Sequence, residues 1–194
     1  MLILGIGGTA RPESSSERAL VRALQTARSM GCDVAMLSGA DIDVPMYSPQ
    51  GQVLSGNTAR LVELMRACDG LIISSPAYHG SVSGLVKNAL DYAEELRDDD
   101  RPYFDGRAVG CIATANGWQG ANAALVALRS IVHALRGWPT PLGAAINTGG
   151  ASTSDSEAQV DLIARQVVEF ARSAYATRQH FTSPAPLKLA HSRH

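Results

Sequence analysis

Cysteine is scarce in this chain of 194 residues, and the three that occur stand far apart. Cys32, Cys68 and Cys111 show no Cys-x-x-Cys spacing, and an odd number does not suit a set of paired cysteines. The sequence therefore argues against a disulfide framework and against a cysteine-based zinc site. It predicts reduced thiols in the core or on the surface.

Two glycine signatures are also absent. The chain contains neither Gly-x-x-x-x-Gly-Lys-Ser nor Gly-x-Gly-x-x-Gly, which removes the usual evidence for a nucleoside triphosphate loop or a Rossmann dinucleotide site. No nucleophile with a positioned base, no carboxylate pair and no cluster of metal ligands is evident. We therefore predict no catalytic side chain and no metal site, and expect the chemistry to be carried by a cofactor.

The chain has no block of lysine or arginine, and its net charge is −1. This balance argues against nucleic acid or an anionic membrane as the main partner and predicts a small-molecule ligand. No apolar run approaches the ~20 residues that a membrane helix needs, and the first four residues lack a basic leader. The sequence thus predicts a cytoplasmic protein that does not enter a membrane.

Short apolar runs alternate with stretches of helical periodicity along the chain. Continuous apolar runs of this length are typical of strands buried on both faces of a parallel sheet. We predict an α/β fold with a five-stranded parallel sheet in flavodoxin order, 2-1-3-4-5, and helices on both faces. The predicted strands are residues 2–6, 33–37, 70–74, 109–113 and 142–146. A single domain is expected over residues 1–182, followed by a loosely ordered tail over 183–194.

Hydroxyl groups crowd the loop that follows the first predicted strand. Thr9, Arg11 and three consecutive serines, 14–16, lie just before a helix whose first backbone N–H groups have no partners. Arginine and hydroxyl donors at a helix N-terminus suit a phosphate monoester. The alternative is a capped surface loop, since Ser14 and Glu17 fit a capping box, although capping explains only one serine.

A second notable stretch joins the third strand to a helix that is predicted over residues 84–96. Pro76, Gly80 and Gly84 interrupt every periodicity, so we expect residues 76–83 to form a loop. The first and third strands flank the switch point of a flavodoxin-order sheet, where ligands bind beyond the carboxyl ends of the strands. Both loops are therefore expected to face one crevice.

These two stretches resemble the NADPH-dependent FMN reductase family. The run from Gly8 to Ser16 is similar to the family's Gly-Ser-x-Arg-x-x-Ser-x-Asn/Ser loop, and residues 76–91 are similar to its Pro-x-Tyr-Asn-Gly-Ser and Gly-x-Leu-Lys-Asn-x-x-Asp elements. The resemblance covers roughly residues 1–175. It implies that four residues hold the FMN phosphate, namely Thr9, Arg11, Ser14 and Ser16. It also implies that a second group lies along the isoalloxazine ring, namely Pro76, Tyr78, His79, Gly80 and Ser81.

The chain departs from the family pattern at two places. His79 stands where the family commonly has Asn, and residues 116–119 are bulkier than the usual glycine-rich third loop. We include Asn116, Gly117 and Trp118 among the expected cofactor-binding residues. Two interpretations of Trp118 stay open, because a loop tryptophan can stack beside the flavin or nicotinamide and can equally fill a subunit interface.

The resemblance implies hydride transfer from NADPH to FMN, after which the reduced flavin serves a second acceptor. That acceptor is a flavin-dependent monooxygenase partner, a quinone or oxygen. A second hypothesis is an FMN-dependent dehydrogenase with its own organic substrate, which the altered third loop would bind. A third is electron transfer without catalysis, as in flavodoxin, which the near-neutral charge disfavours.

We also expect a homodimer or homotetramer. The helix after Gln119 carries apolar residues over more than one face, although one face suffices to cover a sheet, and monomers rarely expose broad apolar patches.

Overall fold

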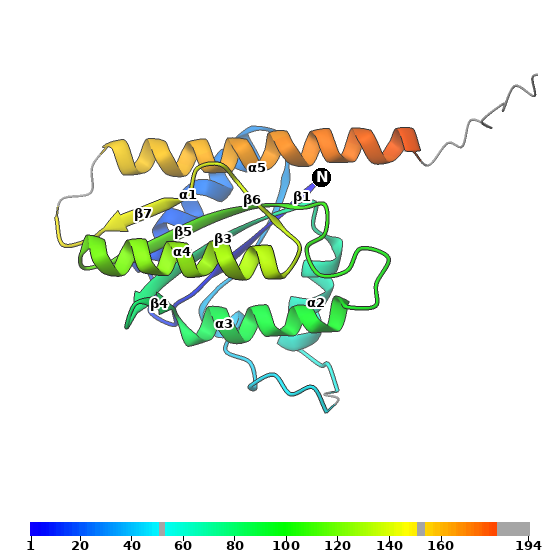
Figure 1. Cartoon of the computed structure of the whole chain (residues 1–194), viewed down its shortest axis with the longest axis horizontal. Helices are drawn as coiled ribbons and strands as arrows, with labels where there is room; N and C mark the ends of the chain where they lie inside the picture. The colour runs from blue at the N-terminus through cyan, green and yellow to red at the C-terminus, as the bar shows by residue number, and fades with distance from the viewer. Residues whose placement is uncertain (51–52, 151–153, 182–194) are drawn as a thin grey trace, which may run out of the picture.

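The predicted apolar runs form the centre of a seven-stranded sheet in a computed structural model, which describes residues 1–50, 53–150 and 154–181 (Figure 1). Strand β1 (Leu2–Gly7) lies between β2 (Asp33–Leu37) and β3 (Gly70–Tyr78), and β5 (Ala108–Ala115) follows β3. All of these neighbours are parallel. The predicted α/β fold with a flavodoxin-type strand order is confirmed.

The fifth position of the sheet differs from the prediction, because two short strands share it. Strand β6 (Trp138–Pro139) pairs with the start of β5, and β7 (Ala144–Asn147) pairs with its carboxyl end. The ladder is interrupted between them because the Leu142 N–H donates to the side-chain amide oxygen of Gln166 on the C-terminal helix, at 3.1 Å, and not to the sheet. The expected single strand at residues 142–146 is therefore preceded by a separate two-residue strand.

Helices cover both faces of the sheet, as predicted (Figure 1). Helices α1 (Ser15–Ser29) and α5 (Ser154–Phe181) enclose one core with Ile3, Ile72 and Ile112 of the sheet. The other face is covered by α2 (Asn57–Ala67), α3 (Gly84–Asp91) and α4 (Trp118–Ala134). The predicted tail at residues 183–194 lies outside the described residues.

The segment at residues 76–83 is not the loop that we predicted. Strand β3 continues to Tyr78, and Ser81–Val82 forms the short antiparallel strand β4 beside it. His79 and Gly80 make the two-residue turn between them, with φ of 52° and 81°. Positive φ at both central residues is the geometry that matches the natural twist of a hairpin. The expected helix over 84–96 begins at Gly84 as predicted and tightens into a 3₁₀ turn, η2 (Tyr92–Leu96).

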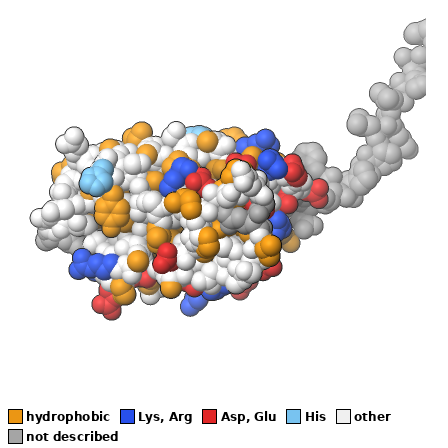
Figure 2. Space-filling view, turned by 90° about the horizontal axis from the view of Figure 1, so that it is seen from below, with side chains coloured by type: hydrophobic (Ala, Val, Ile, Leu, Met, Phe, Trp, Pro, Cys, Tyr) orange, Lys and Arg blue, Asp and Glu red, His pale blue; other side chains and the backbone are white. Residues whose placement is uncertain are grey.

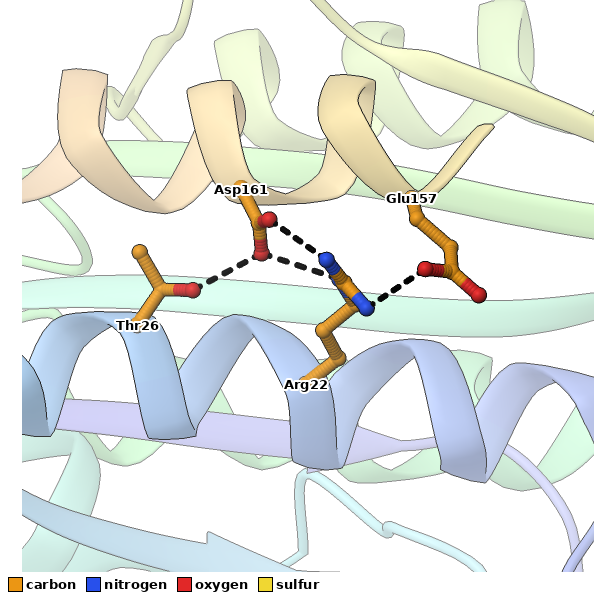
Figure 3. Close-up of polar contacts among 4 residues, drawn as sticks. All are labelled: Arg22, Thr26, Glu157 and Asp161. Atoms are coloured by element: carbon orange, nitrogen blue, oxygen red, sulfur yellow. Dashed lines mark hydrogen bonds and ion pairs between the residues drawn. The ribbon is translucent and has the colours of Figure 1, made fainter. Parts of the chain in front are cut away.

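An ion-pair network joins α1 to α5 (Figure 3). The Arg22 guanidinium donates to both carboxylate oxygens of Asp161, at 3.0 and 2.7 Å, and to Glu157 at 2.7 Å. The Thr26 hydroxyl donates to Asp161 at 2.8 Å. The hydrogen bond from Arg22 lowers the pKa of Asp161. The network therefore stabilises the fold above the ordinary aspartate pKa of about 3.9, and this contribution is lost as the pH falls through the lowered value.

Asn88 holds the long connection between β2 and α2 against α3. Its side-chain amide donates to the carbonyls of Val44 and Pro45, both at 3.1 Å, and accepts from the backbone N–H of Tyr47 at 2.9 Å. The Tyr92 hydroxyl donates to Pro45 as well, at 2.9 Å. These bonds explain why an amide occupies this position of the helix motif.

Lys87 and Asp91 form the exposed ion pair that their spacing predicts, with Nζ of Lys87 2.5 Å from Oδ1 of Asp91.

All three cysteines are free and buried, which fits the expectation of reduced thiols. Burial raises the pKa of Cys68 and of Cys111 to about 12, so neither thiol ionises at neutral pH. The molecular surface seen in Figure 2 intersperses basic, acidic and hydrophobic side chains without a broad field of one kind. Within the described residues, no helix is long and apolar enough to cross a membrane.

Candidate functional site

The loop after β1 leaves the sheet through a position where only glycine fits. The Gly8 N–H donates to the carbonyl of Ser74 on β3 at 2.9 Å. A Cβ atom on Gly8 would lie 2.5 Å from Cγ2 of Val86 and 3.1 Å from Cδ of Pro76, which is closer than packed atoms allow. The close approach brings the first loop directly beside the start of the second.

Hydroxyl groups of the first loop gather at the N-terminus of α1. Ser14 caps the helix, since its Oγ accepts from the Glu17 N–H at 3.2 Å and lies 3.1 Å from Oγ of Ser16. The Oγ1 of Thr9 accepts from the Arg11 N–H at 3.0 Å. Thr9 and Ser16 are buried, whereas Arg11 is exposed and forms no ion pair within residues 1–50, 53–150 and 154–181. The Ser14 cap and the predicted hydroxyl cluster thus occur together, although the Glu17 carboxylate accepts from the Glu13 N–H and not from the Ser14 N–H that a capping box requires.

Of the two glutamates in this loop, Glu17 is held by hydrogen bonds, and Glu13 lines the same cavity as the arginines. The Glu17 carboxylate accepts from the Glu13 N–H at 2.6 Å and from the Ser38 hydroxyl at 3.0 Å. Arg18 donates to the Glu13 carbonyl and, at 3.4 Å, to the Ser15 hydroxyl. Two guanidinium groups, Arg11 and Arg18, and the partial positive charge of the helix N-terminus therefore favour an anion here.

One cavity of about 490 Å³ joins the three loops at the carboxyl end of the sheet. This volume falls within the ~300–1,000 Å³ of small-molecule sites. Seven of the predicted cofactor-binding residues line it, namely Thr9, Arg11, Ser14, Ser16, Pro76, Tyr78 and Asn116. The cavity therefore brings together the hydroxyl cluster, the end of β3 and the end of β5.

Five predicted site residues lie outside the cavity lining, namely His79, Gly80, Ser81, Gly117 and Trp118. The hairpin turn carries the first three beyond the cavity, because β3 continues to Tyr78 before the chain reverses. Trp118 is the first residue of α4 rather than part of a loop, and 61% of it is exposed.

The predicted cofactor-binding set omits five polar residues that line the cavity, namely Glu13, Ser15, Arg18, Thr114 and Thr148. Arg18 stands one helical turn after Ser14, a spacing that could have indicated a second cation at the helix N-terminus. Thr114 and Thr148 lie at the carboxyl ends of β5 and β7, where a doubly wound sheet binds its ligands. The two chain segments lie side by side here, since the Thr148 N–H donates to the carbonyl of Ala115, the residue after Thr114, at 2.7 Å.

Comparison with known proteins agrees with this geometry. Residues 1–151 match the family model described as NADPH-dependent FMN reductase. The chain belongs to this family. It is therefore an NAD(P)H-dependent oxidoreductase that uses FMN, as the sequence resemblance implied. The hydroxyl cluster, the guanidinium groups and the closely packed glycine fit the phosphate of that cofactor.

Two curated relatives are similar over most of the chain. An NAD(P)H-dependent FMN reductase of Pseudomonas aeruginosa is 32% identical over 66% of this chain and 66% of its own length. The chain thus spans about two thirds of that relative. An FMN-dependent NADPH-azoreductase of Staphylococcus aureus is 32% identical over 69% of this chain and 72% of its own.

Among solved structures, a flavoenzyme NAD(P)H:(acceptor) oxidoreductase from Paracoccus denitrificans shares the fold, with a TM-score of 0.68 and 21% identity. The match covers 90% of this chain and 97% of that one. In the part of the chain that the structure describes, no three His, Cys, Asp or Glu side chains are grouped so that they could hold a metal ion.

The turn geometry predicts that His79 contributes to stability through its backbone conformation. A φ of 52° lies in the left-handed region, which His, Asn and Asp adopt more readily than β-branched residues do, and the strain for a residue that disfavours it is about 1–2 kcal/mol. We expect His79→Val to lower the free energy of unfolding by about this amount and His79→Asn to leave it unchanged or slightly higher, as measured by urea denaturation. Both variants should keep the FMN affinity within about threefold. A loss of turnover in His79→Asn, with stability intact, would instead give the imidazole a chemical role.

Proposed function

We propose that this protein reduces FMN with NADPH and passes the reduced flavin's electrons to a second acceptor. The observation that carries the proposal is the cavity of about 490 Å³ in which the hydroxyl and arginine cluster of residues 9–18 meets the ends of β3 and β5. The family to which the chain belongs supports the same reaction.

One group of residues would bind the phosphate of FMN, and a second group would line its ring. Arg11, Ser14 and Ser16, with Thr9, would hold the phosphate through charge-assisted hydrogen bonds. Pro76, Tyr78 and Asn116 would line the ring of the flavin. Bound FMN supplies the hydride-accepting chemistry, so the chain needs to bind, orient and exclude solvent rather than provide an acid or a base.

For the second acceptor we propose a flavin-dependent monooxygenase partner, a quinone or oxygen. The names of the two curated relatives, one an FMN reductase and one an azoreductase, support a reductase with a broad choice of acceptor. The free cysteines suit a reducing compartment such as the cytoplasm, where we propose that the protein acts. A dehydrogenase with its own substrate has less support, because of the altered residues 116–119 only Asn116 lines the cavity.

Arg11 provides a direct test of the phosphate site. A hydrogen bond to a charged group contributes about 1.5–3 kcal/mol, so Arg11→Ala should weaken FMN binding roughly 10- to 150-fold in a titration of apoprotein. Riboflavin, which has no phosphate, should bind Arg11→Ala and the parent protein equally. Arg28→Ala, an exposed change in the last turn of the same helix, is the matched control. Unchanged FMN affinity in Arg11→Ala would refute the assignment.

Flavin reduction separates a reductase from a dehydrogenase. In anaerobic stopped flow, we expect NADPH to bleach the FMN absorbance at a rate at least as high as steady-state turnover. Turnover should also rise and saturate as free FMN is added with oxygen or a quinone present. If bleaching takes minutes while the protein stays folded and yellow, the reductase hypothesis fails and a substrate-specific dehydrogenase becomes the better one.

We also propose that the protein forms a homodimer or homotetramer through α4. Val126 is 69% exposed on this helix, and Leu125 and Ile131 are only partly buried beside it, while Leu128 and Val132 already cover the sheet. Static light scattering at micromolar concentration should therefore give a mass of at least twice the 20.4 kDa of one chain. Val126→Lys should lower that mass, and a monomeric parent protein would contradict the proposal.

A further inference from the structure

A second cavity of about 330 Å³ adjoins the first at its phosphate end. It lies between the first half of α1, the carboxyl end of β7 and the start of α5. Ser15, Arg18 and Thr148 line both cavities, so these side chains form the boundary between them. A ligand that extends past the phosphate site at this boundary would enter the second cavity.

The lining of the second cavity combines apolar and polar side chains. Ala19, Ile146 and Val160 are apolar, Asn147, Thr148 and Ser156 carry amide and hydroxyl groups that can donate and accept, and the Glu157 carboxylate accepts from Arg22. Apolar surface with a few convergent polar groups is the usual chemistry of a small-molecule site.

The two arginines in this cavity are not equivalent. Arg22 is held by both oxygens of Asp161 and by Glu157, so its charge is already balanced (Figure 3). Arg18 donates only to a backbone carbonyl and a serine hydroxyl, and it forms no ion pair with a carboxylate among the described residues. The cation offered to a ligand at the boundary is therefore Arg18.

A heterocycle site beside an arginine matches a nucleoside phosphate. Resting on the proposed reductase function, we propose that the second cavity binds an adenosine phosphate group, with Arg18 on the phosphate. Two molecules carry this group to a flavin site, namely NADPH and FAD. FAD contains FMN, so with its FMN part in the first cavity its adenosine phosphate would extend past the flavin phosphate into the second cavity; NADPH is a separate molecule, and its adenosine phosphate would occupy the second cavity beside bound FMN.

Binding of the adenosine phosphate can be measured without turnover. Protein saturated with FMN is titrated calorimetrically with 2′,5′-ADP and with 5′-AMP. We expect saturable binding of at least one of them, weakened roughly 10- to 150-fold in Arg18→Ala and unchanged in Arg28→Ala. Ile146→Trp, which narrows the second cavity at a residue that does not line the first, should weaken this binding too. Absence of saturable binding, or equal binding by Arg18→Ala and Ile146→Trp at full FMN occupancy, would overturn the proposal.

Two further comparisons identify the source of the adenosine. If it belongs to NADPH, Arg18→Ala should raise the KM for NADPH roughly 10-fold or more and leave that for NADH unchanged. If it belongs to FAD, Arg18→Ala and Ile146→Trp should lower the affinity of apoprotein for FAD relative to FMN. If neither ratio changes, the proposal is wrong. Failure of the reductase function is a separate result, since the parent protein would then not oxidise NADPH at all.

Discussion

The site depends on one close contact between neighbouring strands, where Gly8 leaves β1 against β3. Its N–H donates to the Ser74 carbonyl at 2.9 Å, and the Ser74 hydroxyl donates to the Ser16 carbonyl in the first turn of α1 at 2.8 Å. The buried Ser74 thereby ties the strand to the helix that carries the hydroxyl cluster. A Cβ atom at Gly8 would clash with Val86, so glycine allows the first loop to pass close to the end of β3. Both segments line the same cavity.

The charges around this contact are arranged for an anion and not for acid–base catalysis. Glu17 is engaged by a backbone N–H and the Ser38 hydroxyl, and Arg22 is engaged by α5. Arg11 and Arg18 are left to act with the helix N-terminus. A site of this kind binds and orients a phosphorylated cofactor, which agrees with a family whose chemistry comes from FMN.

Much of the fold could be predicted because buried parallel strands and sheet-covering helices have distinct patterns. The strands at Leu2–Gly7 and Asp33–Leu37 and the cap at Ser14 are local features. The β3–β4 hairpin was missed because Pro76 and Gly80 suggested a loop, whereas only pairing across the chain makes residues 77–78 and 81–82 a ladder. The divided fifth strand was missed because two residues are too few to show a period.

By itself the sequence predicted a phosphate site, since the spacing of Thr9, Arg11 and the serines before a helix is a local property of the chain, and the family resemblance implied that the phosphate is that of FMN. It also predicted the order of the first four strands, because the length and polarity of each run restrict the topology. Only the tertiary structure decided which residues share the cavity. Thr114, Thr148 and Arg18 enter it, and Trp118 does not, because the direction of a side chain depends on where its strand ends and its helix begins.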